Sequence, residues 1–216
     1  MVDTHDNVNL WRDAEHALAY LRNRDLIPHR TEAYEILLEI LPQGVERVLD
    51  LGTGDGLALG IVLSARPGVA GVGLDFQDEM LDRARERFAG APGVEIRRHD
   101  LDDPLPDDIG EFDAVISCFA IHHLGPERQA ALYAEVFAHL RPGGLFANAE
   151  HVASTTPKRH EEFLHALGTT LENDDPSNKL VPVPMHLTWL EECGFADAEC
   201  LWKWREIAVV SGNKPA

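Results

Sequence analysis

The chain has 216 residues, 44% of them hydrophobic and 26% charged, a balance typical of one globular domain with a buried core. Its 37 acidic and 19 basic residues give a formal net charge of −18, which disfavours nucleic acid as a partner because a phosphate backbone would be repelled. The cysteines (118, 193 and 200) are too dispersed for a zinc motif or a disulfide framework, and no segment is apolar enough to predict a leader or a membrane span. We therefore expect a reducing, cytoplasmic location.

Helical spacing of apolar residues predicts two helices at the start of the chain, over 11–24 and 31–41. From residue 45 the pattern changes to short apolar segments that alternate with amphipathic helices. We expect strands over 45–52, 69–75, 94–99, 112–117 and 145–150, and helices over 56–66, 77–89 and 127–140. This alternation predicts an α/β fold, a Rossmann-like doubly wound sheet that is mostly parallel.

The alternation stops after residue 151. We expect a helix over 157–171, an irregular proline-rich stretch over 172–184, a short helix over 188–193, and strands over 195–204 and 206–211. The last two strands are too close for a parallel crossover, so they predict an antiparallel hairpin.

These elements predict a single domain, 1–216. Its expected parts are N-terminal helices (1–44), a cofactor-binding core (45–151), a lid (152–187), and a C-terminal helix with a hairpin (188–216).

The strongest chemical signal is the segment LDLGTGDG, residues 49–56. A strand ends near Asp50, and glycines follow at 52, 54 and 56 before a helix begins. Glycine lets a ligand approach the backbone, and ligands of open α/β sheets bind at the carboxyl ends of strands. The turn therefore predicts a nucleotide-type cofactor site.

The spacing of the turn bears on the type of cofactor. The dinucleotide fingerprint is GxGxxG, whereas this turn is GxGxG with Asp55 inside it, where a carboxylate would oppose a pyrophosphate. A cofactor without phosphate is favoured, and a nicotinamide-dependent oxidoreductase is the alternative. Asp75 ends the second strand, where it could accept hydrogen bonds from a ribose diol in either case, and Asp100 ends the third, where it could accept one from an adenine amino group.

Five segments in this order, VLDLGTGDG, GLD (73–75), HDL (99–101), FDAVISCFAIHHL and LRPGGLF (140–146), resemble the class I S-adenosylmethionine-dependent methyltransferases. The resemblance covers about residues 45–152 and is specific for the cofactor rather than for the substrate. The chain lacks the Asn/Asp-Pro-Pro-Tyr/Phe tetrapeptide of enzymes that methylate amino groups of adenine, cytosine or glutamine. It also lacks the acidic metal set of metal-dependent catechol-type enzymes, so we expect no metal.

The resemblance implies a set of cofactor-binding residues. Gly52 and Gly54 would approach the methionine moiety, Asp75 would hold the ribose hydroxyls beside Phe76, and Asp100 with the Leu101 backbone would recognise adenine. Ser117 and Cys118 would lie beside the methionine portion, and Arg30 or His29 near its carboxylate. The remaining expected cofactor contacts are Asp50, Thr53 and Met80.

The adjacent histidines in SCFAIHHL raise the question of a base. A sulfonium methyl is already activated, so positioning accounts for much of the rate, and a base contributes where the acceptor loses a proton. His122, His123 and His151 follow strands four and five and are the candidate catalytic bases, with His186 a weaker one. Pocket lining, strand-end capping and a three-histidine metal site are the alternatives. Residues that could line an acceptor pocket, or pack in the core or lid, are Trp11, Tyr20, Met185 and Trp189.

The resulting hypothesis is an S-adenosylmethionine-dependent methyltransferase acting on a small molecule. The alternatives are a protein or tRNA methyltransferase and a cofactor-binding regulatory domain without turnover. The sequence does not identify the acceptor or the oligomeric state.

Overall fold

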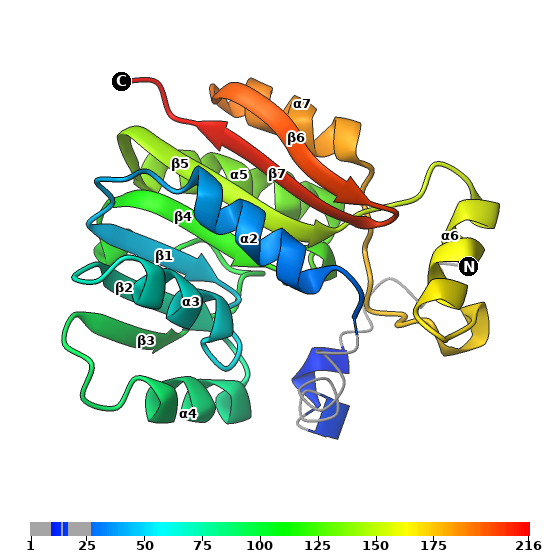
Figure 1. Cartoon of the computed structure of the whole chain (residues 1–216), viewed down its shortest axis with the longest axis horizontal. Coiled ribbons are helices and arrows are strands. Elements are labelled where there is room, and N and C mark those ends of the chain that lie inside the picture. The colour runs from blue at the N-terminus through cyan, green and yellow to red at the C-terminus, as the bar shows by residue number, and fades with distance from the viewer. Residues whose placement is uncertain (1–9, 14, 17–26) are drawn as a thin grey trace.

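The computed structural model describes residues 10–13, 15–16 and 27–216 (Figure 1). In this part of the chain a seven-stranded sheet has the order β3-β2-β1-β4-β5-β7-β6. The strands are β1 (Arg47–Leu51), β2 (Ala70–Asp75), β3 (Val94–Arg98), β4 (Phe112–Cys118), β5 (Leu140–His151), β6 (Ala196–Trp204) and β7 (Ile207–Asn213). Strands β1 to β5 pair in parallel, whereas β7 is antiparallel to both β5 and β6. The predicted fold class is confirmed.

Helices cover both faces of this sheet. They are α2 (Arg30–Ile40), α3 (Leu57–Ala65), α4 (Asp78–Arg87), α5 (Pro126–His139), α6 (Pro157–Ala166) and α7 (Val183–Cys193), and the short 3-10 turns include η1 (Leu10–Arg12), η3 (Asp107–Ile109), η4 (Ile121–His123) and η5 (Leu171–Asn173). Figure 1 shows α2 and α3 in front of the sheet and α5 and α7 behind it. Most of the helix expected over 11–24 lies outside the described residues.

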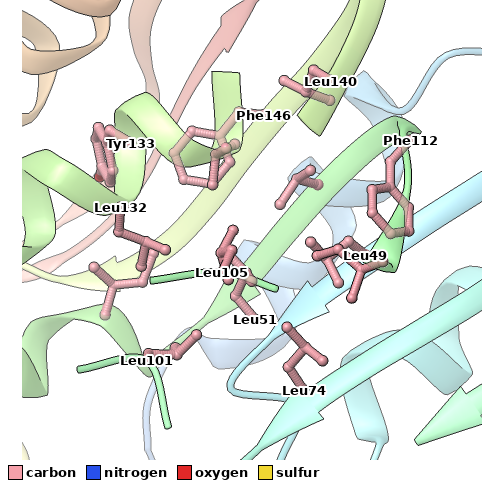
Figure 2. Close-up of a cluster of buried hydrophobic side chains, with 14 of the residues drawn as sticks. Leu49, Leu51, Leu74, Leu101, Leu105, Phe112, Leu132, Tyr133, Leu140 and Phe146 are labelled. Atoms are coloured by element: carbon pink, nitrogen blue, oxygen red, sulfur yellow. The ribbon is translucent and has the colours of Figure 1, made fainter. Parts of the chain in front are cut away.

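The two faces of β1 explain the two halves of the core. Leu49 and Leu51 pack with residues of α5 and α7, whereas Val48 packs with residues of α2 and α3. Figure 2 shows the first half, in which Phe146 of β5 lies beside Tyr133 of α5, and Leu51 and Leu74 continue the cluster along the sheet. Alternate side chains of a strand point to opposite faces, so a parallel strand covered on both sides is apolar throughout.

Three boundaries differ from the sequence prediction by five residues. Helix α6 ends at Ala166 rather than 171, because Gly168 takes a left-handed φ of 75° and the N–H of Thr169 turns back to the carbonyl of Leu164. Helix α7 begins at Val183 rather than 188, since a proline in its first turn needs no N–H partner. Strand β5 already begins at Leu140, and residues 141–144 form an irregularity in its pairing with β4.

The strand order creates a crevice at the carboxyl edge of the sheet. From β1 the chain crosses through α3 to β2 on one side, and from β4 through α5 to β5 on the other. Adjacent strands whose connections leave in opposite directions form the switch point at which open α/β sheets bind ligands. We therefore expect the ligand site at the residues that follow β1 and β4.

Candidate active site

A cavity with about 890 Å³ of empty space, part of it open to solvent, lies at this switch point. Its wall combines the segments that follow β1, β2, β3 and β4 with side chains of η1, α2 and η4. Four strand ends thus contribute to one site.

The glycine turn forms the floor of the cavity. Gly52 has a φ of 68°, and a Cβ added there would lie 2.2 Å from the Cβ of Ala120, so the two segments touch only because residue 52 has no side chain. A Cβ on Gly54 would have no atom within 4 Å. The turn is fixed from below, since Thr53 Oγ1 donates to Asp50 Oδ2 at 2.7 Å and the Thr53 N–H donates to the carbonyl of Leu74 at 2.8 Å.

Asp75 joins the ends of β1 and β2. Its Oδ2 accepts from the N–H of Gly54 at 2.8 Å and its Oδ1 accepts from the N–H of Gln77 at 2.9 Å. Burial raises the pKa of this carboxyl, while these backbone donors favour its ionised form. Two carboxylate oxygens offer about four acceptor positions, so the carboxylate can take further donors from a ligand.

The third strand end is closed by the N-terminal segment. Arg12 Nη2 lies 2.7 Å from Asp100 Oδ2, and its guanidinium carbon lies 5.4 Å from the centre of the Phe76 ring. Trp11 of the same turn lines the cavity, and its ring lies 5.1 Å from that of His123. The wall of the cavity therefore includes residues far from the β-strand motifs.

The carboxylate inside the glycine turn is paired. Arg87 of α4 donates from Nη2 to Asp55 Oδ2 and from Nε to the Asp55 carbonyl, both at 2.7 Å. The repulsion of a pyrophosphate expected from Asp55 is thus weakened, and the argument against a dinucleotide rests on glycine spacing alone. Beneath the turn, burial raises the pKa of Asp50 to about 7.

The three candidate histidines lie in different surroundings. The His122 side chain bonds through Nδ1 to Oε1 of Glu150, which is fully buried, and His151 Nε2 lies 3.0 Å from Glu206 Oε2. Neither lines the cavity. His123 does line it, and its ring lies 3.9 Å from the ring of His122. Burial lowers the pKa of both His122 and His123 well below the usual value.

Sequence comparisons agree with the motif order. Residues 48–144 match the family model of a methyltransferase domain. An uncharacterized methyltransferase of Mycobacterium tuberculosis is 36% identical over 115 residues, which cover 53% of this chain and 55% of that protein. A demethylmenaquinone methyltransferase of Clavibacter sepedonicus is 29% identical over 175 residues, covering 74% and 69%. The chain thus spans little more than half the length of the first of these relatives.

Comparison with solved structures agrees with the fold. An O-methyltransferase family protein from Burkholderia thailandensis superposes with a TM-score of 0.74 at 18% identity, covering 94% of this chain and 61% of that one. The segment 48–144 thus matches a methyltransferase domain, and the order of its motifs is that of the class I S-adenosylmethionine-dependent methyltransferase superfamily.

Most residues that the resemblance to this superfamily implies as cofactor contacts line this one cavity. These are Gly52, Thr53, Gly54, Asp75, Phe76, Met80, Asp100, Leu101 and Cys118. Asp50 and Ser117 do not: Asp50 lies under the turn, and the buried Ser117 hydroxyl donates to the Leu51 carbonyl at 2.9 Å. Burial raises the pKa of the Cys118 thiol well above its usual value, so it lines the cavity as an uncharged group.

Arg30 and His29, the two candidates for a contact with the cofactor carboxylate, lie in different surroundings. Arg30 lines the cavity, where its Nε donates to the Tyr34 hydroxyl at 2.8 Å and its guanidinium lies over the Phe119 ring. His29 instead bonds to Glu32 and packs against Trp204. Trp189 packs on Tyr133, Met185 is exposed, and Tyr20 lies outside the described residues. His186 bonds through Nδ1 to the Tyr133 hydroxyl.

Two cavity residues, and one that contacts the cavity wall, carried no functional signal in the sequence. Tyr34 is predicted only as part of a helix, Ala120 only as part of the segment after the fourth strand, and Ser177, which contacts His123 without lining the cavity, only as part of an irregular stretch. The 152–187 segment packs on η4, since the N–H of Lys179 donates to the His122 carbonyl at 2.7 Å, but none of its residues lines the cavity. Within the described ranges there is no cluster of three or more potential metal ligands, and no helix long and apolar enough to cross a membrane.

Proposed function

We propose that this chain transfers a methyl group from S-adenosylmethionine to a small-molecule acceptor, with His123 as the general base. The observation that carries the proposal is the arrangement of the strand ends. The open face of Gly54, the Asp75 carboxylate and the His123 ring all line one cavity at the switch point.

The cavity fits the cofactor that the superfamily uses. A Cβ on Gly54 would meet nothing, which leaves room for the methionine portion against the backbone, and Asp75 keeps acceptor positions for two ribose hydroxyls. Phe76 and Asp100 offer a ring face and a carboxylate for an adenine, and the Arg12 side chain that pairs with Asp100 would have to adjust. Arg30 is a cation placed for the cofactor carboxylate.

The hydrogen bonds around His123 define which ring nitrogen is the base. Ser177 Oγ donates its one proton to Asp175 Oδ1 at 2.6 Å, so it can only accept from His123 Nδ1, 3.3 Å away. We infer that neutral His123 is protonated on Nδ1 and carries its lone pair on Nε2. That nitrogen is buried and has no hydrogen-bond partner among the described residues, as expected of a base that waits for the proton of an acceptor.

Neighbouring groups support this role. Burial keeps the pKa of His123 low, so the ring is neutral at neutral pH, and the charge of Asp175 offsets part of that effect once the ring takes a proton. His122 is held by Glu150 and stacks on His123, which fixes the position of η4. Bound S-adenosylmethionine supplies a methyl group that needs no further activation, so the residues have to orient the acceptor and accept its proton.

The walls near His123 favour a small acceptor with apolar surface. Trp11, whose ring lies 5.1 Å from that of His123, lines the cavity together with the apolar Phe119 and Leu124. The net charge of −18 disfavours tRNA. The superposed protein of B. thailandensis is described as an O-methyltransferase family member, which is consistent with a hydroxyl acceptor.

A labelling experiment tests the proposal. The chain would be incubated with methyl-labelled S-adenosylmethionine and panels of hydroxyl, amine, thiol and carbon acceptors, alongside tRNA and protein extracts. We expect label in a small-molecule acceptor, and loss of that label in the variant His123→Gln. Label only in tRNA or protein, or binding of S-adenosylhomocysteine without any transfer, would favour the corresponding alternative.

A further inference from the structure

A second hollow lies at the far end of the β6–β7 hairpin. It has about 950 Å³ of space, part of it open solvent, and none of its lining residues lines the cavity of the proposed active site. Four chain segments meet in it: the residues after β5, the first turn of α6, the start of α7, and the end of the hairpin. Its lining residues are Ala153, Ser154, Thr155, Arg159, Pro182, Val183, Pro184, Lys203 and Arg205.

The charge of this hollow opposes that of the whole chain. Acidic residues outnumber basic ones 37 to 19 in the sequence, yet the lining includes Arg159, Lys203 and Arg205 and no acidic residue. The first turn of α7, an 11-residue helix without a side-chain cap at its start, also lines the hollow and adds partial positive charge. A chain under selection for an acidic surface alone would not be expected to gather cations in one concavity.

Two of the cations are held in place by one residue of α6. Arg159 Nη1 donates to the Glu162 carboxylate at 2.8 Å, and Arg205 Nη1 donates to the Glu162 carbonyl at 3.0 Å. A guanidinium has five N–H donors, so each arginine keeps donors for a ligand. Arg205 sits at the hairpin turn with a left-handed φ of 50°.

Lys203 is the least compensated of the three. Its side chain is exposed, and in the described part of the chain no carboxylate lies within ion-pair distance of its ammonium group. The nearest influential acid is Glu206, whose carboxylate is already bonded to His151 and His160. Partial desolvation by the surrounding protein lowers the pKa of Lys203, and the charge of Glu206 only partly opposes this effect.

We propose that this basic hollow is a binding site for a small oxyanion, a phosphate or carboxylate group carried by a metabolite. Two anchored guanidinium groups and one lysine ammonium, from α6 and from the end of the hairpin, can surround such a group, and charge-assisted hydrogen bonds of this type are the strongest available to it. The site is separate from the proposed methyl-transfer cavity and does not depend on that activity.

Amide NMR titrations of the full chain with inorganic phosphate, pyrophosphate and citrate test the proposal. We expect saturable shifts of the amide signals of residues 153–155 and of Val183 with at least one of the three probes, since Pro182 and Pro184 have no amide proton. The comparison of pyrophosphate with citrate distinguishes a phosphate-bearing ligand from a carboxylate-bearing one. In the variant Lys203→Gln, and separately in Arg159→Gln, the affinity should fall about tenfold or more.

Lys158→Gln is the matched control, because Lys158 precedes Arg159 on α6 but does not line the hollow. Its affinity for the probe should equal that of the unmodified chain, as should the affinity of all three variants for S-adenosylhomocysteine. The absence of saturable shifts with every probe, or equal losses in Lys158→Gln and Lys203→Gln, would overturn the proposal whether or not the chain transfers methyl groups.

Discussion

The hydroxyl oxygen of Ser177 lies 3.3 Å from Nδ1 of His123, although 54 positions separate the two residues in the chain. Because the same hydroxyl donates to Asp175, the contact fixes the tautomer of the histidine and leaves Nε2 as the basic nitrogen. The loop before α7 thereby sets the chemistry of a ring at the end of β4.

Replacing Ser177 by alanine should reduce turnover without reducing cofactor affinity. The variant loses the acceptor for His123 Nδ1–H, and one neutral hydrogen bond of about 1.4 kcal/mol corresponds to roughly a tenfold lower kcat. The measurement is kcat beside the Kd for S-adenosylhomocysteine. Ser177→Thr, which keeps the hydroxyl, should recover most of the activity. An unchanged kcat in Ser177→Ala would disprove the proposed role of Ser177 in setting the tautomer of His123.

Replacing His123 should lower kcat, whereas replacing His122 should lower the free energy of unfolding. His123→Gln should lower kcat by about 10²–10⁴-fold, the usual contribution of a general base, while leaving cofactor affinity unchanged. His122→Gln should instead lower the free energy of unfolding by roughly 1–3 kcal/mol, because the buried Glu150 loses its ring partner. Urea unfolding and kcat measured on both variants separate the roles.

The exposed His165 supplies the control, and His165→Gln should change neither quantity. If His122→Gln rather than His123→Gln abolished turnover in a fully folded protein, the assignment of the base would be wrong.

The pH dependence of activity should reflect the burial of His123. The base acts in its neutral form, and burial lowers its pKa, so the acid limb of kcat/KM should lie below about pH 6.5, the value of a free imidazole. Trp11→Ala uncovers the ring, whose centre lies 5.1 Å from that of Trp11, and should move the limb upward. An acid limb of kcat/KM at or above about pH 6.5 in the wild type would contradict the burial of a catalytic His123.

Two glycines of the same turn should tolerate alanine unequally. Both have positive φ, but a Cβ at Gly52 would lie 2.2 Å from the Cβ of Ala120, whereas one at Gly54 would meet no atom. Gly52→Ala should therefore be less stable than Gly54→Ala by about 1–3 kcal/mol, the usual cost of overpacking. Equal free energies of unfolding in urea would show that the two segments do not touch as described.

Asp50 should make stability fall with rising pH. Its folded pKa of about 7 is above the unfolded value of 3.8, so its contribution is complete below the unfolded pKa and is lost as the pH rises through the folded one. Between pH 5 and 7, the free energy of unfolding of Asp50→Asn should rise relative to that of the wild type by up to about 1.4 kcal/mol per pH unit. Urea unfolding at several pH values checks this, and a constant difference between the two proteins would contradict it.

The sheet was predictable because short apolar segments alternate with segments of helical spacing along the chain. Asp75 and Asp100 were predictable as cavity residues because the ends of parallel strands share one edge of the sheet. Periodicity places a residue on a strand or helix, but it does not tell which ring at a strand end faces a cavity. His122 and His123 are adjacent in sequence, and only the packing of Glu150 from β5 separates their roles.

Contacts between distant segments were the part that the sequence did not reveal. Arg12 reaches Asp100 across 88 positions, and Arg87 reaches Asp55 across 32. No local pattern marks either pair, because an arginine on a helix or a loop has the same local signal whether it faces solvent or a carboxylate. The sequence argument that the Asp55 carboxylate would oppose a pyrophosphate is weaker for this reason, because Arg87 pairs with that carboxylate.

Calorimetric titration with S-adenosylhomocysteine tests the central claim most directly. Three proteins are compared: the wild type, Asp75→Ala, which removes the carboxylate between Gly54 and Gln77, and Asp78→Ala, which removes a nearby exposed carboxylate that pairs with Arg98 outside the cavity. We predict one binding site in the wild type and in Asp78→Ala, and strongly weakened binding in Asp75→Ala. No binding to the wild type, or equal binding to all three proteins, would contradict the account.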